Sequence, residues 1–389
     1  MGQCVYAKGT VIQKTPINEE TTGYAFKRRP GSNVERLIME SGGAAFLFIK
    51  AAGTHYDVGR KIGSEAKHLI QKYFHNDQNI PNYIGKSESQ QVFIRNLLEF
   101  EALYGNFGTF RCTDLLLNTQ TAAVIGHNED GESGEHGSSY IIDAHYFNVS
   151  PRGRLLVPEE RFVSFCYPGG LPGSTFAYNI HGMVSTINYI VGKHVKNDRL
   201  PMNVLLRATL SATNLDHLIE IIRNKGIGIG FPVSMNVAFL SNKQTFYTFE
   251  IFTQESDDKS QTDFKIMGIK KEDGEQTSNC AHVSDEFTYG YYYHCNHFRH
   301  IAGTDAIPPC SRIRTTYLET NPAPKTKSDI HRILTNKMII RPIEVMGVDS
   351  YITLATVIFD LCAEQLEIYT SRRQGPEVPP DIILKINDL

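Results

Sequence analysis

Two short apolar runs separated by a polar turn give the clearest pattern of hydrophobic and polar positions in this chain. They cover residues 110–118 and 122–130, and the link at 119–121 has the length of a hairpin loop. The pattern predicts a β-hairpin that returns Asp130 towards Cys112. A cysteine on a strand is more often a small buried apolar residue than a nucleophile, so its neighbours must decide the role of Cys112.

Other apolar patterns predict blocks of helices and blocks of strands. Before the hairpin, we expect a strand at 46–50 and helices at 58–70 and 82–103. After it, we expect an amphipathic helix at 205–223 and another helix near 328–337. The strands expected in this part are 140–147, 162–167, 175–180, 183–189, 233–240, 245–252, 353–360 and 365–369. Such blocks favour a layered α+β architecture over alternating βαβ units.

Length and charge limit the classes of protein that fit. The chain has 389 residues, of which 41% are hydrophobic and 21% charged, which is enough to bury a large core. It contains no internal repeat or convincing linker, so we expect a peripheral polar segment at 1–34 and a single domain at 35–389. The net charge of −3 does not favour nucleic acid or an anionic membrane as a partner; a small neutral or cationic substrate fits better.

The cysteines and the N-terminus bear on location. Seven cysteines without a CxxC motif do not form a disulfide framework, so we expect a reducing, cytoplasmic setting. No apolar run reaches about 18 residues, and no transmembrane segment is expected. The start Met1-Gly2-Gln3-Cys4 has the residues that dual acylation uses, but Tyr6 stands where the myristoylation pattern has Ser or Thr. An unmodified start is favoured, and N-terminal lipid anchoring is the alternative.

Two active-site hypotheses use histidine. A metal cluster would draw its ligands from Cys280, His282, His294, Cys295, His297 and His300. A structural zinc site usually shows two tight ligand pairs at regular spacing, and these residues do not. A papain-like Cys–His dyad would need a partner found only in space, and none of the cysteines has the papain-type local signature.

A third hypothesis needs no histidine. If the chain is cut before Cys112, this residue gains an α-amine whose reference pKa of about 7.7–8.0 suits a base at neutral pH. One residue then supplies both the nucleophile and the base, as an N-terminal Thr does. An aspartate would orient the amine and an amide would hold the oxyanion, and Asp130 and Asn236 are available.

Short motifs in one order along the chain connect these residues with a known family. They are 53–59 (an opening helix), Cys112-Thr113 (the nucleophile), 128–130 (the amine-orienting Asp), 179–188 (two Asn around a Gly), 234–236 (the oxyanion Asn), 294–298, Ser311-Arg312 and 353–360 (a closing strand). Each motif alone is weak, but together and in this order they are specific. From about residue 45 to about residue 372 the chain resembles the acyl-CoA:isopenicillin-N acyltransferase family of N-terminal-nucleophile hydrolases, and most of all its animal branch of N-β-alanyl-amine hydrolases.

The resemblance implies an α+β fold, the four-layer αββα sandwich, with Cys112 heading a central strand. It also implies self-cleavage between Arg111 and Cys112. The products would be an α-chain of residues 1–111 and a β-chain of residues 112–389, which stay together as a heterodimer. No cofactor and no metal are implied.

The family's functional residues carry over by motif. Cys112 is implied to be the nucleophile, its α-amine the base, Asp130 the orienting group and Asn236 the oxyanion donor. Ser311, Arg312 and Asn128 are implied to bind substrate or support the site. Tyr292, in the Tyr-rich patch 291–293, could stack on a catechol or imidazole ring of the substrate. Structural roles remain open: Asn236 and Ser311 as turn-stabilising groups, Arg312 as the partner of a surface carboxylate, and Tyr292 as a packing residue.

The activity implied is hydrolysis of the amide between a small acyl group such as β-alanyl and a biogenic amine, as in β-alanyl-dopamine or carcinine. Acyl transfer from a thioester such as acyl-CoA is the alternative, although the chain lacks obvious basic phosphate-binding loops. A non-catalytic binding protein of the same fold is a third hypothesis. The family generally has a small residue before the nucleophile, whereas Arg111 would crowd the strained turn that an N-to-S acyl shift requires.

Overall fold

The structure is a computed structural model of the chain. It describes residues 4–7, 10–16, 112–132, 139–146, 159–167, 171–190, 200, 202–223, 228–253, 262–272, 287–301, 307–340, 351–370 and 378–389. The predictions for the strand at 46–50, the helices at 58–70 and 82–103, the motif at 53–59 and Arg111 lie outside these residues.

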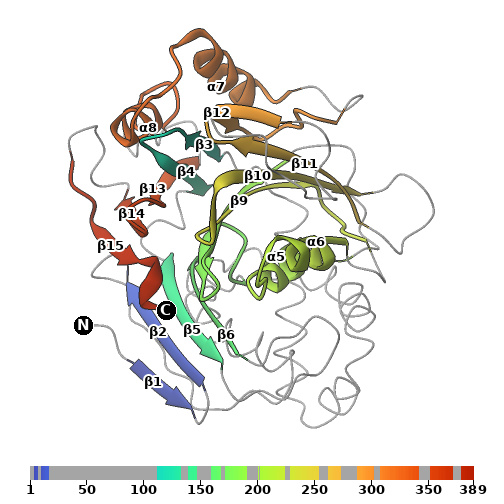
Figure 1. Cartoon of the computed structure of the whole chain (residues 1–389), viewed down its shortest axis with the longest axis vertical. Helices are drawn as coiled ribbons and strands as arrows, with labels where there is room; N and C mark the ends of the chain where they lie inside the picture. Colours follow the sequence, from blue (N-terminus) through green and yellow to red (C-terminus); the bar gives the residue numbers. More distant parts are fainter. Residues whose placement is uncertain are drawn as a thin grey trace.

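Fifteen strands of the described chain follow one hydrogen-bonded order, β1-β2-β5-β6-β7-β8-β9-β10-β11-β12-β3-β4-β13-β14-β15 (Figure 1). Their bounds are β1 Cys4–Ala7, β2 Thr10–Pro16, β3 Thr113–Asn118, β4 Ala123–Glu132, β5 Tyr140–Tyr146, β6 Glu160–Cys166, β7 Phe176–Asn179, β8 Met183–Tyr189, β9 Val233–Phe239, β10 Asn242–Thr253, β11 Thr262–Lys270, β12 Phe287–His294, β13 Tyr351–Asp360, β14 Gln365–Thr370 and β15 Ile382–Lys385. The described helices are α5 Met202–Thr209, α6 Leu215–Arg223, α7 Pro309–Thr320, α8 Lys327–Leu334 and the 3₁₀ helix η3 Ile386–Asp388. Neighbouring strands are antiparallel except β11 and β12, which are parallel.

The continuous sheet bends back on itself at β11 and β12, so its two halves can be described as two sheets. We call β1, β2 and β5–β11 sheet A, and β12, β3, β4, β13, β14 and β15 sheet B. Rings from the two sheets pack against one another, with centroids 6.5 Å apart for Tyr178 and Phe359 and 6.2 Å apart for His127 and Phe176. The side-chain amide of Asn118 in β3 also donates to two carbonyls of sheet A. These contacts join strands far apart in the order, so the sheets lie face to face.

Helices cover the outer face of each sheet. The outer face of β3 and β4 packs on α8, where Leu115 and Val124 join Ile330 and Leu334 in one apolar cluster. On the other side, α6 packs on β11, and Figure 1 shows α5 and α6 well apart from α7 and α8. The layers are therefore helix, sheet A, sheet B and helix, which confirms the α+β sandwich expected from the sequence.

The central hairpin is confirmed, and its composition follows from burial on both faces. Every residue of β3 is buried, so Leu115, Leu116 and Leu117 form a continuous apolar run instead of an alternating one. Gly126 lets α8 approach β4, because a Cβ there would lie 2.4 Å from the Cγ2 of Ile330. A capping box between Thr326 and Asp329 starts α8.

Most other predicted elements of the described residues are confirmed to within a few residues. The single helix expected at 205–223 is wrong, because the chain breaks into α5 and α6. The side chain of Asn214 accepts the backbone N–H of His217 at 2.9 Å and so starts a second helix. Strands β1, β2, β11, β12 and β15 and helix α7 were not predicted. No helix of the described residues is long and apolar enough to cross a membrane.

Candidate active site

Cys112 directly precedes β3, in the middle of sheet B. Thr113 pairs with Asn128 of β4, which places Cys112 beside the next two residues of that strand. The residue is fully buried, and the backbone N–H of Asp130 donates a hydrogen bond towards its sulfur. Burial, helped by the charge of Glu129, raises the pKa of Cys112 well above its usual value. The thiol of the uncut chain is therefore protonated at neutral pH.

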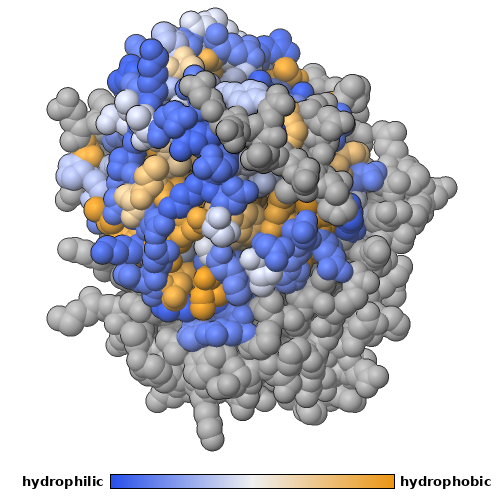
Figure 2. Space-filling model, viewed as in Figure 1, coloured by the Kyte–Doolittle hydropathy of each residue, from blue (hydrophilic) through white to orange (hydrophobic). Residues whose placement is uncertain are grey.

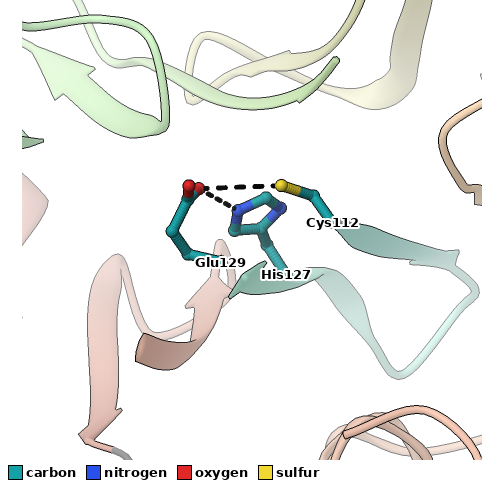
Figure 3. A group of neighbouring side chains, drawn as sticks. All are labelled: Cys112, His127 and Glu129. Carbon is teal, nitrogen blue, oxygen red and sulfur yellow. Dashed lines mark hydrogen bonds and ion pairs between the residues drawn. The ribbon is translucent and has the colours of Figure 1, made fainter. Parts of the chain in front are cut away.

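A buried histidine between two carboxylates lies next to this thiol (Figure 3). The ring of His127 binds Asp114 through Nδ1 at 2.8 Å and Glu129 through Nε2 at 2.9 Å. The thiol of Cys112 lies 4.0 Å from the same oxygen of Glu129. Burial lowers the pKa of His127, but the two carboxylates outweigh it and raise the pKa to about 10. Both ring nitrogens thus carry protons and donate.

Glu129 is fixed from sheet A as well. The hydroxyl of Tyr167, which follows β6, donates to the second carboxylate oxygen of Glu129. Burial raises the pKa of Glu129 above its usual value, while the hydrogen bonds from His127 and Tyr167 oppose that shift. Neither His127 nor Glu129 was predicted as a site residue. Both share one face of β4 by strand alternation, so the period of two is the signal that could have found them.

Asp130 alternates to the other face of β4, towards the helices. Its Oδ1 accepts a hydrogen bond of 2.6 Å from the hydroxyl of Thr353 in β13. Its charge acts on the pKa values of both Cys112 and Arg314, so the carboxylate lies near each of them. The structure thus brings Asp130 close to Cys112, as the hairpin pattern predicts.

The arginine that reaches the nucleophile is Arg314 of α7. Its guanidinium donates to the carbonyl of Cys112 at 2.5 Å, to the hydroxyl of Thr113 at 2.6 Å and to Asn296 at 2.7 Å. Arg312, the arginine carried over by motif, is exposed on α7. Figure 2 shows that the top of the molecule, where Figure 1 draws α7, presents mostly hydrophilic residues with a few apolar ones. The helical period explains the difference: positions 311 and 314 share a face, and position 312 is turned away from it.

Ser311 forms hydrogen bonds with two residues of the loop after β12. Its hydroxyl accepts the backbone N–H of Asn296 at 3.0 Å and lies 2.8 Å from Nδ1 of His297. Because Asn296 also accepts from Arg314, Ser311 supports the group that holds Cys112. Burial lowers the pKa of His297 to about 4, so this ring is neutral.

Asn236 lies in a buried polar row across β8, β9 and β10. Its amide nitrogen donates to Asn188 at 3.3 Å and to Thr186 at 3.4 Å, and its oxygen accepts from Thr248 at 2.7 Å. Asn188 in turn donates to the carbonyl of His294 in sheet B. Asn236 therefore faces the interface of the sheets, and its two amide protons are held by long bonds.

The remaining predicted residues have structural partners. Asn128 donates to the carbonyl of Leu334 at 2.8 Å and accepts from Thr356 at 2.7 Å, which ties α8 and β13 to β4. The hydroxyl of Tyr292 lies 2.7 Å from Nε2 of His300, and the two rings stack. Burial raises the pKa of Tyr292 well above its usual value.

The described cysteine and histidine residues considered for a metal cluster have other partners. His294 pairs with Glu250, Cys295 lies in the apolar cluster under α7 and α8, and His300 binds Tyr292, while Cys280 and His282 lie outside the described residues. A different set, Cys112, His127 and Glu129, offers ligand atoms within 4.8 Å of one another. A metal there would have to displace the proton that His127 donates to Glu129.

Comparison with known proteins places the chain in a family. The family model described as acyl-coenzyme A:6-aminopenicillanic acid acyl-transferase matches residues 117–374. The match covers more than half of the chain, so the protein belongs to this acyltransferase family, as the motifs indicate. Cys112 stands five residues before the matched region.

A curated relative and two solved structures are also similar. A beta-alanyl-dopamine/carcinine hydrolase of Drosophila melanogaster is 28% identical over 276 residues, which make up 68% of this chain and 66% of the relative. This chain thus spans just under two thirds of the relative's length. The structures are two single-residue variants of conjugated bile acid hydrolase from Clostridium perfringens, each with 12% identity, a TM-score of 0.41, and coverage of 72% of this chain and 93% of that chain.

Proposed function

We propose that this protein is a self-processing cysteine amidohydrolase that cleaves the amide of an N-β-alanyl amine, with β-alanyl-dopamine and carcinine as candidate substrates. The observation that carries the proposal is the setting of Cys112. This residue heads a central strand of the sandwich, its sulfur meets the N–H of Asp130, and its carbonyl is held by Arg314. Membership of an acyl-transferring family and similarity to a hydrolase of β-alanyl amines support the class of reaction.

Maturation is the first step of the proposed mechanism. The sulfur of Cys112 attacks the carbonyl carbon of Arg111, the peptide C–N bond breaks, and the nitrogen of Cys112 takes up a proton. Water then hydrolyses the thioester. The products are a carboxylate on Arg111 and a free α-amine on Cys112.

Turnover uses the same sulfur with the new amine as base. The α-amine takes the thiol proton, the sulfur attacks the amide carbonyl of the substrate, and the proton passes to the departing amine. Asp130 orients the α-amine. Asn236 gives up one of its two long hydrogen bonds and donates that proton to the oxyanion of the tetrahedral intermediate. Water resolves the acyl-enzyme and releases the acid.

The two chains stay associated in this proposal. Strand β2 belongs to the future α-chain, and it pairs with β5 of the β-chain from Thr10 against Tyr146 to Pro16 against Tyr140. These strands lie near one edge of sheet A, where β1 is the outermost strand. The ladder supports a heterodimer after the cut.

Acyl transfer is the second candidate, because the matching family model is that of an acyltransferase. The two reactions share an acyl-enzyme and differ in whether water or an acceptor amine resolves it. Product analysis with β-alanyl-dopamine, with carcinine, and with an acyl-CoA plus a free amine separates them. Free β-alanine from the first two is the expected result. A new amide from acyl-CoA, without hydrolysis of either amide, would overturn the hydrolase proposal.

A further inference from the structure

The proposed maturation leaves one proton without an acceptor. In the uncut chain the nitrogen of Cys112 is a peptide nitrogen, so no α-amine exists to accept the thiol proton. The thiol is also fully buried, and its pKa is raised well above its usual value by burial. A second base must therefore act in the first cut, and this step rests on the self-cleavage proposed above.

We propose that Glu129 is that base: its carboxylate accepts the proton of Cys112 during self-cleavage, with His127 and Asp114 holding it in place. The thiol already donates towards the Oε2 of Glu129 over 4.0 Å. Figure 3 shows Cys112, His127 and Glu129 pointing towards one another from β4 and the start of β3. Proton transfer requires the sulfur and this oxygen to come within hydrogen-bond reach, so the contact shortens during the reaction.

Neighbouring groups are less suited to the task. Both nitrogens of His127 are bonded to carboxylates, and the pKa of about 10 keeps the ring protonated at neutral pH. Asp114 binds the far nitrogen of that ring. The carboxylate of Asp130 accepts a hydrogen bond from Thr353, and its backbone N–H donates towards the sulfur. Glu129 is thus the carboxylate whose oxygen meets the thiol.

Charge is conserved within the cluster during the transfer. Before it, the negative charges are on Asp114 and Glu129, and His127 is positive. After it, Glu129 is neutral and the sulfur carries the negative charge, with the imidazolium of His127 still beside it. The sulfur lies within 4.8 Å of the His127 ring, and the net charge of the cluster is unchanged, so the transfer creates no additional buried charge.

The acyl shift then balances with the groups present, and water afterwards hydrolyses the thioester as described above. The thiolate forms a C–S bond with the carbonyl carbon of Arg111, and the C–N bond to Cys112 breaks. Glu129 returns the proton to the departing nitrogen. Once the α-amine is free, it serves as the base in turnover, and Glu129 is no longer required for that step. Glu129 is therefore a residue of maturation more than of turnover.

The test measures the cutting rate of the full-length chain after cell-free synthesis, in pulse-chase format across pH. General bases typically contribute about 10²–10⁴-fold, so Glu129→Gln is expected to slow cutting at neutral pH by about 100-fold or more. Its rate is expected to rise about tenfold per pH unit, because hydroxide must then remove the thiol proton.

Two further variants keep the result decisive. Glu250→Gln removes another buried carboxylate that binds a histidine, His294, at 3.0 Å, and it is expected to keep the wild-type pH profile of cutting. The hydrogen bond from Tyr167 lowers the pKa of Glu129, so Tyr167→Phe is expected to move the acid limb of the profile to higher pH. The titratable groups that act on Glu129 are His127, Tyr167 and Asp114, with the thiol of Cys112 alongside.

The outcomes separate the two proposals. Wild-type rates in Glu129→Gln, or slowing by the same factor at every pH, would overturn the role of Glu129 and leave self-cleavage standing. If Glu129→Gln does not fold, an unshifted acid limb in Tyr167→Phe would overturn it instead. A wild-type chain that is never cut would overturn self-cleavage itself, and with it this inference.

Discussion

The guanidinium of Arg314 donates to the main-chain carbonyl of Cys112 over 2.5 Å, so a helix of the outer layer fixes the residue that carries the nucleophile. The same group also holds Thr113 and Asn296. Through Arg314, helix α7 is therefore tied to the loop after β12 and to the start of β3.

Replacing Arg314 with Ala should destabilise the protein and slow self-cleavage. The carbonyl of Cys112 and the side chain of Asn296 would lose a buried donor, and each unsatisfied group costs about 1–3 kcal/mol. Urea unfolding of the purified chain measures the loss. Arg312→Ala is the matched control, expected within about 0.5 kcal/mol of wild type because Arg312 is exposed. Equal effects of the two substitutions would contradict the assignment.

Replacing Asn236 with Ala should lower the rate of acyl-enzyme formation. A single oxyanion donor contributes on the order of 10²–10³ in turnover, or about 3–4 kcal/mol, when its bond forms mainly in the transition state. Single-turnover kinetics on processed protein measures the change. Turnover within about threefold of wild type would move the oxyanion hole elsewhere, with Asn188 as the next candidate, and loss through binding alone would assign Asn236 to substrate recognition.

The buried His127 predicts a specific loss of stability with rising pH. Its pKa is raised from about 6.5 to about 10, so its stabilising contribution is fully present below pH 6.5 and is lost as the pH rises through 10. The free energy of unfolding of wild type relative to His127→Gln should therefore shrink over this range. A difference independent of pH would contradict a protonated His127.

Removal of divalent metal ions should leave turnover unchanged. Cys112, His127 and Glu129 lie close enough to share an ion, but His127 uses both ring nitrogens to bind carboxylates. Dialysis against a chelator, followed by a turnover assay, checks this. Loss of activity that added zinc restores would replace the amine-base mechanism with a metal-assisted one.

The local patterns of the sequence predict most of the fold of the described chain. The hairpin of β3 and β4 follows from two apolar runs and a short polar link, and most strands of sheet A follow in the same way. Strand β11 is less regular, since its burial does not alternate cleanly. Helix α7 is mostly polar, with only Ser311, Arg314 and Leu318 buried, so no apolar stripe marks it.

The candidate site likewise contains some residues that the sequence predicts and others that it does not. The order of the motifs predicts Cys112, Asp130 and Asn236 as site residues. Arg314, His127 and Glu129 belong to no such motif, and predicting them requires knowing which face of a helix or strand each one occupies. In a helix, residues three apart share a face, so Arg314 and not Arg312 lies on the same face as Ser311. In a strand, residues two apart share a face, which places His127 and Glu129 together. Tyr167 comes from the opposite sheet, 38 positions from Glu129, and no local pattern predicts that contact.

The mass of the purified protein under denaturing conditions tests the central claim most directly. Wild type is expected to give two polypeptides, residues 1–111 and residues 112–389, the second with a free N-terminal cysteine. Cys112→Ala is expected to give a single full-length chain. A wild-type chain that remains intact and yet hydrolyses β-alanyl amides would contradict the account, because no α-amine would then be present to act as the base.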